Sequence, residues 1–201
     1  MSAVAIVDSG GANVASIGFA LERLGASATL TADPAIIVAA RHVILPGVGA
    51  AKNAMTRLET SGLVPVLRSL QRPLLGICLG MQLLCDSSDE GDTPCLGIVP
   101  GRVRQLSNER VSVPHMGWNQ VSRTGAPGPA SALFDGIDEA AHFYFVHSFA
   151  LAVTPHTSAY CNHAVDFAAA IGKDNFFGVQ FHPERSSSAG QRLLANFLRM
   201  A

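Results

Sequence analysis

The stretch that decides the fold is Arg72-Pro73-Leu74-Leu75-Gly76-Ile77-Cys78-Leu79-Gly80-Met81-Gln82-Leu83-Leu84. Its apolar part, Leu74 to Ile77, follows a proline and predicts a short buried strand. The residues after Gly80 are good helix formers with an apolar face, which predicts a helix. Cys78 therefore lies at a tight turn between a strand and a helix, where the flanking glycines allow the backbone to crowd together.

The Gly-x-Cys-x-Gly pattern around Cys78 matches a nucleophile elbow with cysteine in the serine position. Such a turn pushes the side chain outward and places its sulfur at a helix N-terminus, which favours the reactive thiolate form. The alternative is a buried structural cysteine on a glycine-rich turn. The pattern is short, so taken by itself it leaves both interpretations open.

Apolar runs alternate with helical patterns along the first half of the chain. Together with the strand before Cys78, this repetition predicts a parallel sheet with helices on both faces. Ligands bind at the carboxyl ends of the strands in such sheets, which is where Cys78 lies. Strands are predicted at Ala3 to Val7, Ala28 to Leu30 and His42 to Leu45, and helices from Asn13 or Ser16 to Leu24, from Asp33 to Ala40, from Lys52 to Leu58 and from Val64 to Leu70.

The loop that closes the third strand contains Gly47, Val48 and Gly49. Two glycines let a loop direct several N–H groups at one point, which suits an oxyanion hole or a carboxylate-binding nest. A plain strand-to-helix turn has the same composition. The loop ends a strand at the same sheet edge as Cys78, which favours a shared site.

Strand patterns dominate the second half, so the fold class is α/β, with a mostly parallel central sheet flanked by helices and a β-rich second half. A length of 201 residues fits a single domain, 1–201. The polar run from Ser87 to Pro94 is predicted to be a solvated loop. Strands are predicted at Gly97 to Val99, Arg102 to Leu106, Val111 to Val113, His142 to Phe149, Ala159 to Cys161, Ala168 to Ile171 and Asn175 to Phe181, and a last helix, with a cap among Ser186 to Ser188, from Gln191 to Met200.

A second unusual stretch is Pro114-His115-Met116-Gly117-Trp118-Asn119, which gathers the only Trp, a Met and a His among turn residues. We expect a loop here. A tryptophan in a loop fits either a partner surface or an anchor in the core. By contrast, His147 on the aromatic strand is expected to be hydrogen-bonded structure.

The composition narrows the function. Apolar residues make up 48%, charged residues 14%, and the net charge is −1, so the chain has no electrostatic footprint for nucleic acid or an anionic membrane. No apolar run approaches the ~18 residues of a membrane span, and no basic region precedes the first strand, so no signal peptide is expected. Cys78, Cys85, Cys95 and Cys161 lack a paired metal spacing. We therefore expect reduced thiols, no metal, no cofactor and a cytoplasmic location.

The second candidate catalytic element is His182-Pro183-Glu184. In an extended segment, His182 and Glu184 point to the same side, and Pro183 biases His182 towards an extended conformation. A carboxylate beside an imidazole selects its tautomer and stabilises its charged form. The pair lacks only a nucleophile, and Cys78 supplies one from another strand end, which predicts a Cys-His-Glu triad.

These two motifs resemble those of the class I (triad) glutamine amidotransferases. Further blocks are most similar to the family of glutaminase subunits of imidazole glycerol phosphate synthase, which serve histidine biosynthesis, and they run through nearly the whole chain. The family usually opens with Asp-Tyr-Gly-x-Gly-Asn, whereas this chain has Ser9 for the Tyr and Ala12 for the second Gly, near the family's partner surface. The blocks are Leu45 to Gly49, Pro114 to Asn119, Tyr144 to Phe149 and Gly178 to Glu184.

The resemblance implies hydrolysis of glutamine to glutamate and ammonia through a Cys78 thioester. His182 would carry the proton, Glu184 would orient it, and N–H groups of Leu79 and the Gly47–Gly49 loop would bind the oxyanion. It also implies Gln82 beside the bound glutamine and a separate (β/α)8 cyclase subunit that receives the ammonia in a heterodimer. The residues expected at that partner interface are His115, Met116, Trp118 and Asn119.

Three alternatives remain at this stage. The chain could be the glutaminase subunit of another synthase, such as one of the anthranilate or vitamin B6 pathways. It could be a non-catalytic docking subunit with the same fold, although Cys78, His182 and Glu184 are all present. A general cysteine hydrolase is the third.

Overall fold

The structure is a computed structural model that describes residues 3–10, 14–47, 49–107, 109, 111–125 and 128–201. Three residues that carry sequence predictions, Ala12, Asn13 and Val48, lie outside these ranges. The described residues form one large sheet of eight strands in the order β2-β1-β3-β4-β14-β13-β12-β9. Its strands are β1 (Ala3–Val7), β2 (Ser27–Thr31), β3 (His42–Leu45), β4 (Leu74–Ile77), β9 (Ser122–Arg123), β12 (Thr157–His163), β13 (Val165–Lys173) and β14 (Phe176–Val179).

The first five strands in that order pair in parallel, and the last three add antiparallel. This arrangement confirms the predicted α/β fold with a mostly parallel central sheet, which the antiparallel strands of the second half extend into a mixed sheet. The decisive pairing is that of β14 with β4, because it brings a strand from the end of the chain beside the strand that carries Cys78. The carboxyl ends of β3, β4 and β14 therefore lie next to one another.

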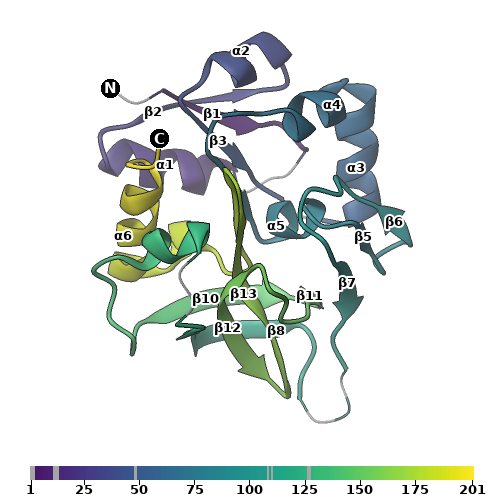
Figure 1. The fold of residues 1–201 in the computed structure, drawn as a ribbon, viewed down its shortest axis with the longest axis vertical. Coiled ribbons are helices and arrows are strands. Elements are labelled where there is room, and N and C mark those ends of the chain that lie inside the picture. The colour runs from purple at the N-terminus through teal and green to yellow at the C-terminus, as the bar shows by residue number, and fades with distance from the viewer. Residues whose placement is uncertain (1–2, 11–13, 48, 108, 110, 126–127) are drawn as a thin grey trace.

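Helices cover both faces of the parallel part (Figure 1). Side chains alternate along β1, so that Val4 and Ile6 pack with α1 and α6, whereas Ala5 and Val7 pack on the other face with α2, α3 and α4. Two apolar cores result, one on each side of the sheet. The helices are α1 (Val14–Arg23), α2 (Pro34–Ala39), α3 (Ala51–Thr60), α4 (Leu63–Arg68), α5 (Leu79–Leu83) and α6 (Ser187–Phe197).

Helix ends follow local chemistry. Asp33 caps α2 by accepting a hydrogen bond from the N–H of Ala35 at 2.8 Å, as its Asp-Pro sequence predicts. Gly25, at φ +74°, ends the turn after α1. The last helix starts at Ser187 and not at Gln191. Its expected serine cap is absent in the described structure, because the Ser186 hydroxyl donates to the carbonyl of His182 instead.

The second half of the chain forms two smaller sheets. Strand β10 (His142–His147) pairs antiparallel with β8 (His115–Gln120), and β11 (Phe149–Leu151) joins β7 (Arg102–Gln105), β5 (Ser87–Ser88) and β6 (Thr93–Pro94). The predicted loop at 114–119 is thus a strand, because the aromatic strand β10 supplies its partner. The strands expected at Gly97 to Val99 and Val111 to Val113 are wrong, since both segments are irregular.

Two 3-10 turns, η1 (Pro129–Phe134) and η2 (Pro183–Arg185), complete the described elements. Within the described ranges, no helix has both the length and the apolar character that a bilayer crossing requires.

Candidate active site

Cys78 lies at the corner between β4 and α5, as the elbow pattern predicts. Its backbone has φ 53° and ψ −111°, a strained conformation for a residue with a side chain. Gly80 permits this turn, because a Cβ there would meet the carbonyl oxygen of Leu45 at 1.8 Å. A Cβ on Gly76 would meet the carbonyl oxygen of Gly80 at 2.6 Å. The two glycines are therefore required by close backbone contacts on both sides of the cysteine.

His182 and Glu184 come from the segment that follows β14. The Nδ1 of His182 donates a hydrogen bond to Oε1 of Glu184 at 2.8 Å, and the two side chains are 6% and 1% exposed. His182 itself is extended, as predicted, at φ −100° and ψ 95°, but Pro183–Arg185 is a 3-10 turn, so the prediction that the segment stays extended through Glu184 is wrong. The turn nevertheless brings the carboxylate onto the imidazole across Pro183.

His182 lies beside Cys78 in the pocket and interacts with it, because the sulfur helps to raise the pKa of the ring. Because Nδ1 is engaged by Glu184, the nitrogen left for the sulfur is Nε2. Burial by itself would lower the pKa of His182, but the hydrogen bonds and charges of Cys78 and Glu184 outweigh it and raise that pKa to about 10. The ring is therefore held in its protonated form beside the sulfur at neutral pH.

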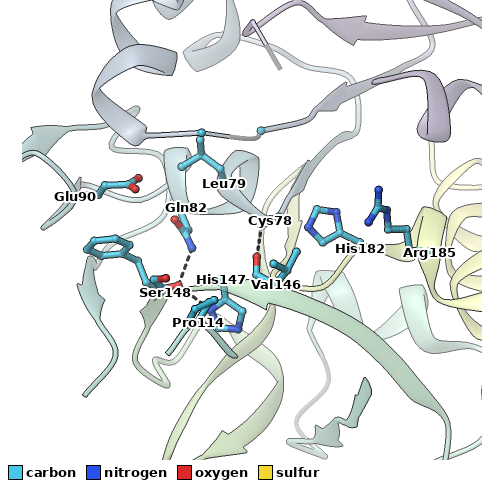
Figure 2. A pocket seen from close by; sticks show the side chains of 13 residues that line it. Cys78, Leu79, Gln82, Glu90, Pro114, Val146, His147, Ser148, His182 and Arg185 are labelled. Carbon is cyan, nitrogen blue, oxygen red and sulfur yellow. Dashed lines mark hydrogen bonds between the residues drawn. The ribbon is translucent and has the colours of Figure 1, made fainter. Parts of the chain in front are cut away.

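Cys78 and His182 open onto a pocket of about 640 Å³, a size typical of small-molecule sites. Figure 2 shows His182 and Arg185 at one end, Glu90 at the other, and Cys78 and Gln82 between them. The residues that line the pocket are Gly47, Gly49, Cys78, Leu79, Gln82, Glu90, Pro114, Val146, His147, Ser148, Phe149, His182 and Arg185.

The structure brings together most of the residues that the sequence nominates for oxyanion or substrate binding. A Cβ on Gly47 would meet the Cβ of Leu79 at 2.6 Å, so the loop after β3 packs directly on the start of α5. Leu79 is the first residue of α5, where backbone N–H groups have no partner within the helix. Gly49, at φ +90°, also lines the pocket. Val48 lies outside the described residues.

Gln82 is buried in the floor of the pocket. Its Nε2 donates to the carbonyl of Phe149 at 2.8 Å and to Oε1 of Gln180 at 2.9 Å. His147 likewise donates from Nδ1 to the carbonyl of Phe149 at 2.9 Å, which confirms its predicted structural role. Three elements are thereby tied together at the pocket: α5, β11 and the end of β14.

Glu90 forms an acidic part of the pocket wall that was not predicted from the sequence. Glu90 belongs to the polar run that was expected to be solvated, yet it is half-buried and its Oε2 accepts the N–H of Ala51 at 2.7 Å. In the same run, Asp89 and Asp92 pair with Arg102. Only the position of Glu90 in the chain could have indicated this role. The helix after the elbow is short, so the residues that follow it stay near the sheet edge where Cys78 lies.

The four residues expected at a partner interface lie on β8. Successive side chains of a strand point to opposite faces, so the four differ in exposure. Met116 and Trp118 are 63% and 53% exposed. His115 is only 4% exposed and stacks on the rings of Phe145 and His163. Asn119 is half-buried and donates to the carbonyl of Asn162 at 3.1 Å. Of the four, Met116 and Trp118 are therefore the ones whose side chains are exposed.

The described part of the chain contains no group of three or more His, Cys, Asp or Glu side chains arranged to hold a metal ion. The chemistry that the pocket offers is that of a thiol, an imidazole and a carboxylate. Such a set performs nucleophilic attack with proton transfer.

Comparisons with known proteins agree with this geometry. The family model for class-I glutamine amidotransferases matches residues 5–201. A protein of Xanthomonas euvesicatoria pv. vesicatoria, named imidazole glycerol phosphate synthase subunit HisH, is 52% identical over 202 residues, covering 100% of this chain and 99% of that protein. A protein of the same name from Vibrio cholerae is 48% identical over 204 residues, with 98% of each chain covered.

Solved structures support the fold. A crystal structure of a glutamine amidotransferase superposes with a TM-score of 0.72 at 18% identity, covering 97% of this chain and 96% of that one. The structure of PurLQS from Thermotoga maritima gives 0.73 at 17% identity, with 98% and 97% covered. At these identities the likeness speaks for the fold only. On the family match and the full-length relatives, the chain belongs to the class-I glutamine amidotransferases and, within them, to the family of HisH subunits of imidazole glycerol phosphate synthase.

Proposed function

We propose that this chain is the glutaminase subunit of an imidazole glycerol phosphate synthase. It hydrolyses glutamine to glutamate and ammonia, and it passes the ammonia to a (β/α)8 cyclase subunit within a heterodimer that serves histidine biosynthesis. The observation that carries the chemistry is that Cys78 and His182 line one pocket, while Glu184 holds the His182 ring from behind. The observation that carries the pathway is about 50% identity to relatives named HisH over their whole length.

The reaction begins with attack of the Cys78 thiolate on the side-chain carbonyl carbon of glutamine. A carbon–sulfur bond forms, and the carbonyl oxygen becomes an oxyanion. We assign the N–H groups of Leu79 and of the Gly47–Gly49 loop to that oxygen, since Leu79 begins α5 and Gly47 packs against it. Donors fixed before the reaction stabilise the developing charge without reorganising.

His182 then supplies the proton that ammonia needs to leave. Once the sulfur is bonded to carbon, the negative neighbour that helped to raise the pKa of His182 is gone, so the pKa falls and the ring becomes a better acid. The carbon–nitrogen bond breaks and a thioester remains on Cys78. Water attacks the thioester, the ring takes its proton, and glutamate leaves with the thiolate restored. Glu184 holds the ring throughout.

The rest of glutamine occupies the part of the pocket beyond Cys78. Glu90 faces this space from the end opposite His182 (Figure 2). A carboxylate is the natural partner of an α-ammonium group, so we assign Glu90 to the amino end of the substrate. Gln82 supports the floor between them.

The cyclase subunit docks on the face of β8 that carries Met116 and Trp118. A large aromatic residue that is half-exposed is typical of an interface hot spot. His115 supports that face from behind through its ring contacts. Residues 1–201 act as one domain, because the eight-stranded sheet draws strands from both halves of the chain. We place the protein in the cytoplasm, where thiols stay reduced, since its four cysteines are free.

The test is ammonia release from glutamine, with and without the cyclase subunit and its ligand. The assembled wild-type complex is expected to release ammonia, and the Cys78→Ala complex is expected to release none. Co-purification decides between pathways, because capture of a (β/α)8 cyclase supports this assignment and capture of a different synthase refutes it. Equal ammonia release by the wild-type and Cys78→Ala complexes would refute the catalytic role.

A further inference from the structure

A buried amide outside the triad faces the nucleophile. Gln180 follows the last residue of β14 and is fully buried. Its backbone N–H donates to the carbonyl of Ala169 at 2.9 Å, which holds the segment against β13. Its side-chain Nε2 lies 3.7 Å from the Sγ of Cys78, a normal distance for an N–H donor to sulfur.

The orientation of this amide is fixed by its neighbours. The carbonyl oxygen of Phe149 can only accept, so the atom of Gln82 that lies 2.8 Å from it must be the donor Nε2. The same Nε2 lies 2.9 Å from the Gln180 side chain, and the group it meets there must be the acceptor Oε1. The remaining group of Gln180, its NH₂, therefore points at Cys78.

The other neighbours of the sulfur show what this donor does. The carbonyl oxygen of Val146 lies 3.7 Å from Sγ and accepts a hydrogen bond only while the sulfur carries a proton. A thiolate would face that oxygen unfavourably, so its stabilisation has to come from donors. His182 is one such donor, and it gives up its proton during the cycle. An amide N–H stays a donor at every step.

We propose that Gln180 is a further residue of the catalytic machinery, which donates a hydrogen bond from Nε2 to the Cys78 sulfur and stabilises its thiolate. Through Oε1 it also sets the position of Gln82 below the substrate. This inference rests on the proposed glutaminase function of the site. It names a third group that acts on the sulfur, besides the imidazole and the helix N-terminus.

A buried amide needs hydrogen-bond partners in any case, so the contacts of Gln180 also fit a purely structural role. In that case its replacement would leave the ionisation of the Cys78 sulfur unchanged. The distinguishing measurement is the rate at which iodoacetamide alkylates Cys78 as a function of pH, followed on the Cys78 peptide by mass spectrometry. The other thiols do not compete, because burial raises the pKa of Cys85 to about 12, of Cys95 to about 11 and of Cys161 to about 12.

Two variants separate the functions of the amide. Gln180→Met keeps the length and removes both the donor and the acceptor. Gln180→Glu keeps an acceptor for Gln82 and replaces the donor with a carboxylate. For both, alkylation at pH 7 is expected to be slower by about tenfold, the effect of one hydrogen bond to a charged group. The pH midpoint moves upward and the rate at high pH is unchanged.

The matched control is Gln71→Glu, at an exposed glutamine just before β4 that donates from Nε2 to the carbonyl of Ser69 at 3.2 Å. It is expected to alkylate like the wild type. In the assembled complex, Gln180→Glu is expected to lower kcat for ammonia release by about tenfold with little change in KM. Variants with the wild-type alkylation profile would overturn the inference, whether or not activity falls. If the assembled wild-type complex released no ammonia from glutamine, the proposed function itself would be overturned.

Discussion

The Nδ1 of His182 lies 2.8 Å from Oε1 of Glu184, and both side chains are almost fully buried. The two residues are separated only by Pro183, and a 3-10 turn brings them together. A buried carboxylate is costly unless it meets a positive partner. The contact therefore does more than orient the ring, because it keeps a proton on the imidazole beside Cys78.

Replacing this carboxylate tests its role. Glu184→Gln removes the charge and is expected to lower the pKa of His182, which NMR titration of the ring carbons would follow. Glutaminase activity of the assembled complex is expected to fall on the order of 100-fold or more, because the ring loses its orienting anion. An unchanged pKa of His182 in this variant would contradict the account.

The same shift predicts how stability depends on pH. The pKa of His182 is raised from 6.5 in the unfolded chain to about 10 in the folded one. Its stabilising contribution is therefore complete below pH ~6.5 and is lost as the pH rises through about 10. The free energy of unfolding should fall between pH 7 and 10, and less steeply in Glu184→Gln. Parallel curves for the two proteins would show that the pair does not supply this dependence.

Crowding at the elbow makes a prediction about the stability of a glycine variant. Gly80→Ala places a methyl group against the carbonyl of Leu45 and is expected to lower the free energy of unfolding by about 1–3 kcal/mol or more. Gly18→Ala is the matched control, because a Cβ there meets nothing within 4 Å and alanine favours the helix interior. Thermal unfolding of the two variants measures the difference. Equal effects would contradict the close contact at the elbow.

Much of the first half of the fold could be predicted from the sequence, because its strands are continuous apolar runs such as Val4 to Val7. The elbow around Cys78 and the His182-Pro183-Glu184 segment were also predictable, because the residue types within each short stretch indicate their chemistry. Strand β8 was not, since it contains Gly117 and Asn119 and no β-branched residue, and it is a strand only through pairing with β10.

Hydrogen bonds between side chains of distant segments could not be predicted from the sequence. Gln82 and Gln180 are 98 residues apart and share a hydrogen bond. Ser9, a departure from the usual family opening, donates to the carbonyl of Pro46 at 3.0 Å at the start of the loop after β3. No periodicity or spacing in the sequence indicates such contacts. They depend on the topology, which decides the strands whose ends lie side by side.

A buried histidine pair behind β8 predicts sensitivity to acid. Nδ1 of His115 and Nε2 of His147 are 3.0 Å apart, and the ring of His147 donates from Nδ1 to Phe149. Burial lowers the pKa of His115 to about 4 and that of His147 to about 3. The contribution of each to stability is therefore present above pH ~6.5 and is lost as the pH falls towards the lowered values.

The melting temperature is thus expected to drop from pH 7 to pH 5. In His115→Met, which cannot take up a proton, that drop should be smaller. A drop of the same size in the variant would mean that other groups are responsible.

The exposed side chain of Trp118 makes a prediction about the partner. Trp118→Ala is expected to weaken binding of the cyclase subunit by about 2 kcal/mol, or roughly 30-fold, without a change in melting temperature. Phe19→Ala is the control, because Phe19 is a similarly exposed aromatic, at 60%, on α1. Isothermal titration calorimetry would measure both. Equal affinities of the two variants for the cyclase subunit would show that β8 is not part of the interface.

The most direct test of the catalytic assignment is to trap the covalent intermediate. The assembled complex would be mixed with glutamine, quenched in acid within its first turnovers, and digested for mass spectrometry. The account predicts a glutamyl group on the peptide that carries Cys78, and its absence in Cys78→Ser. Ammonia release with no adduct on Cys78, or with an adduct on another residue, would contradict it.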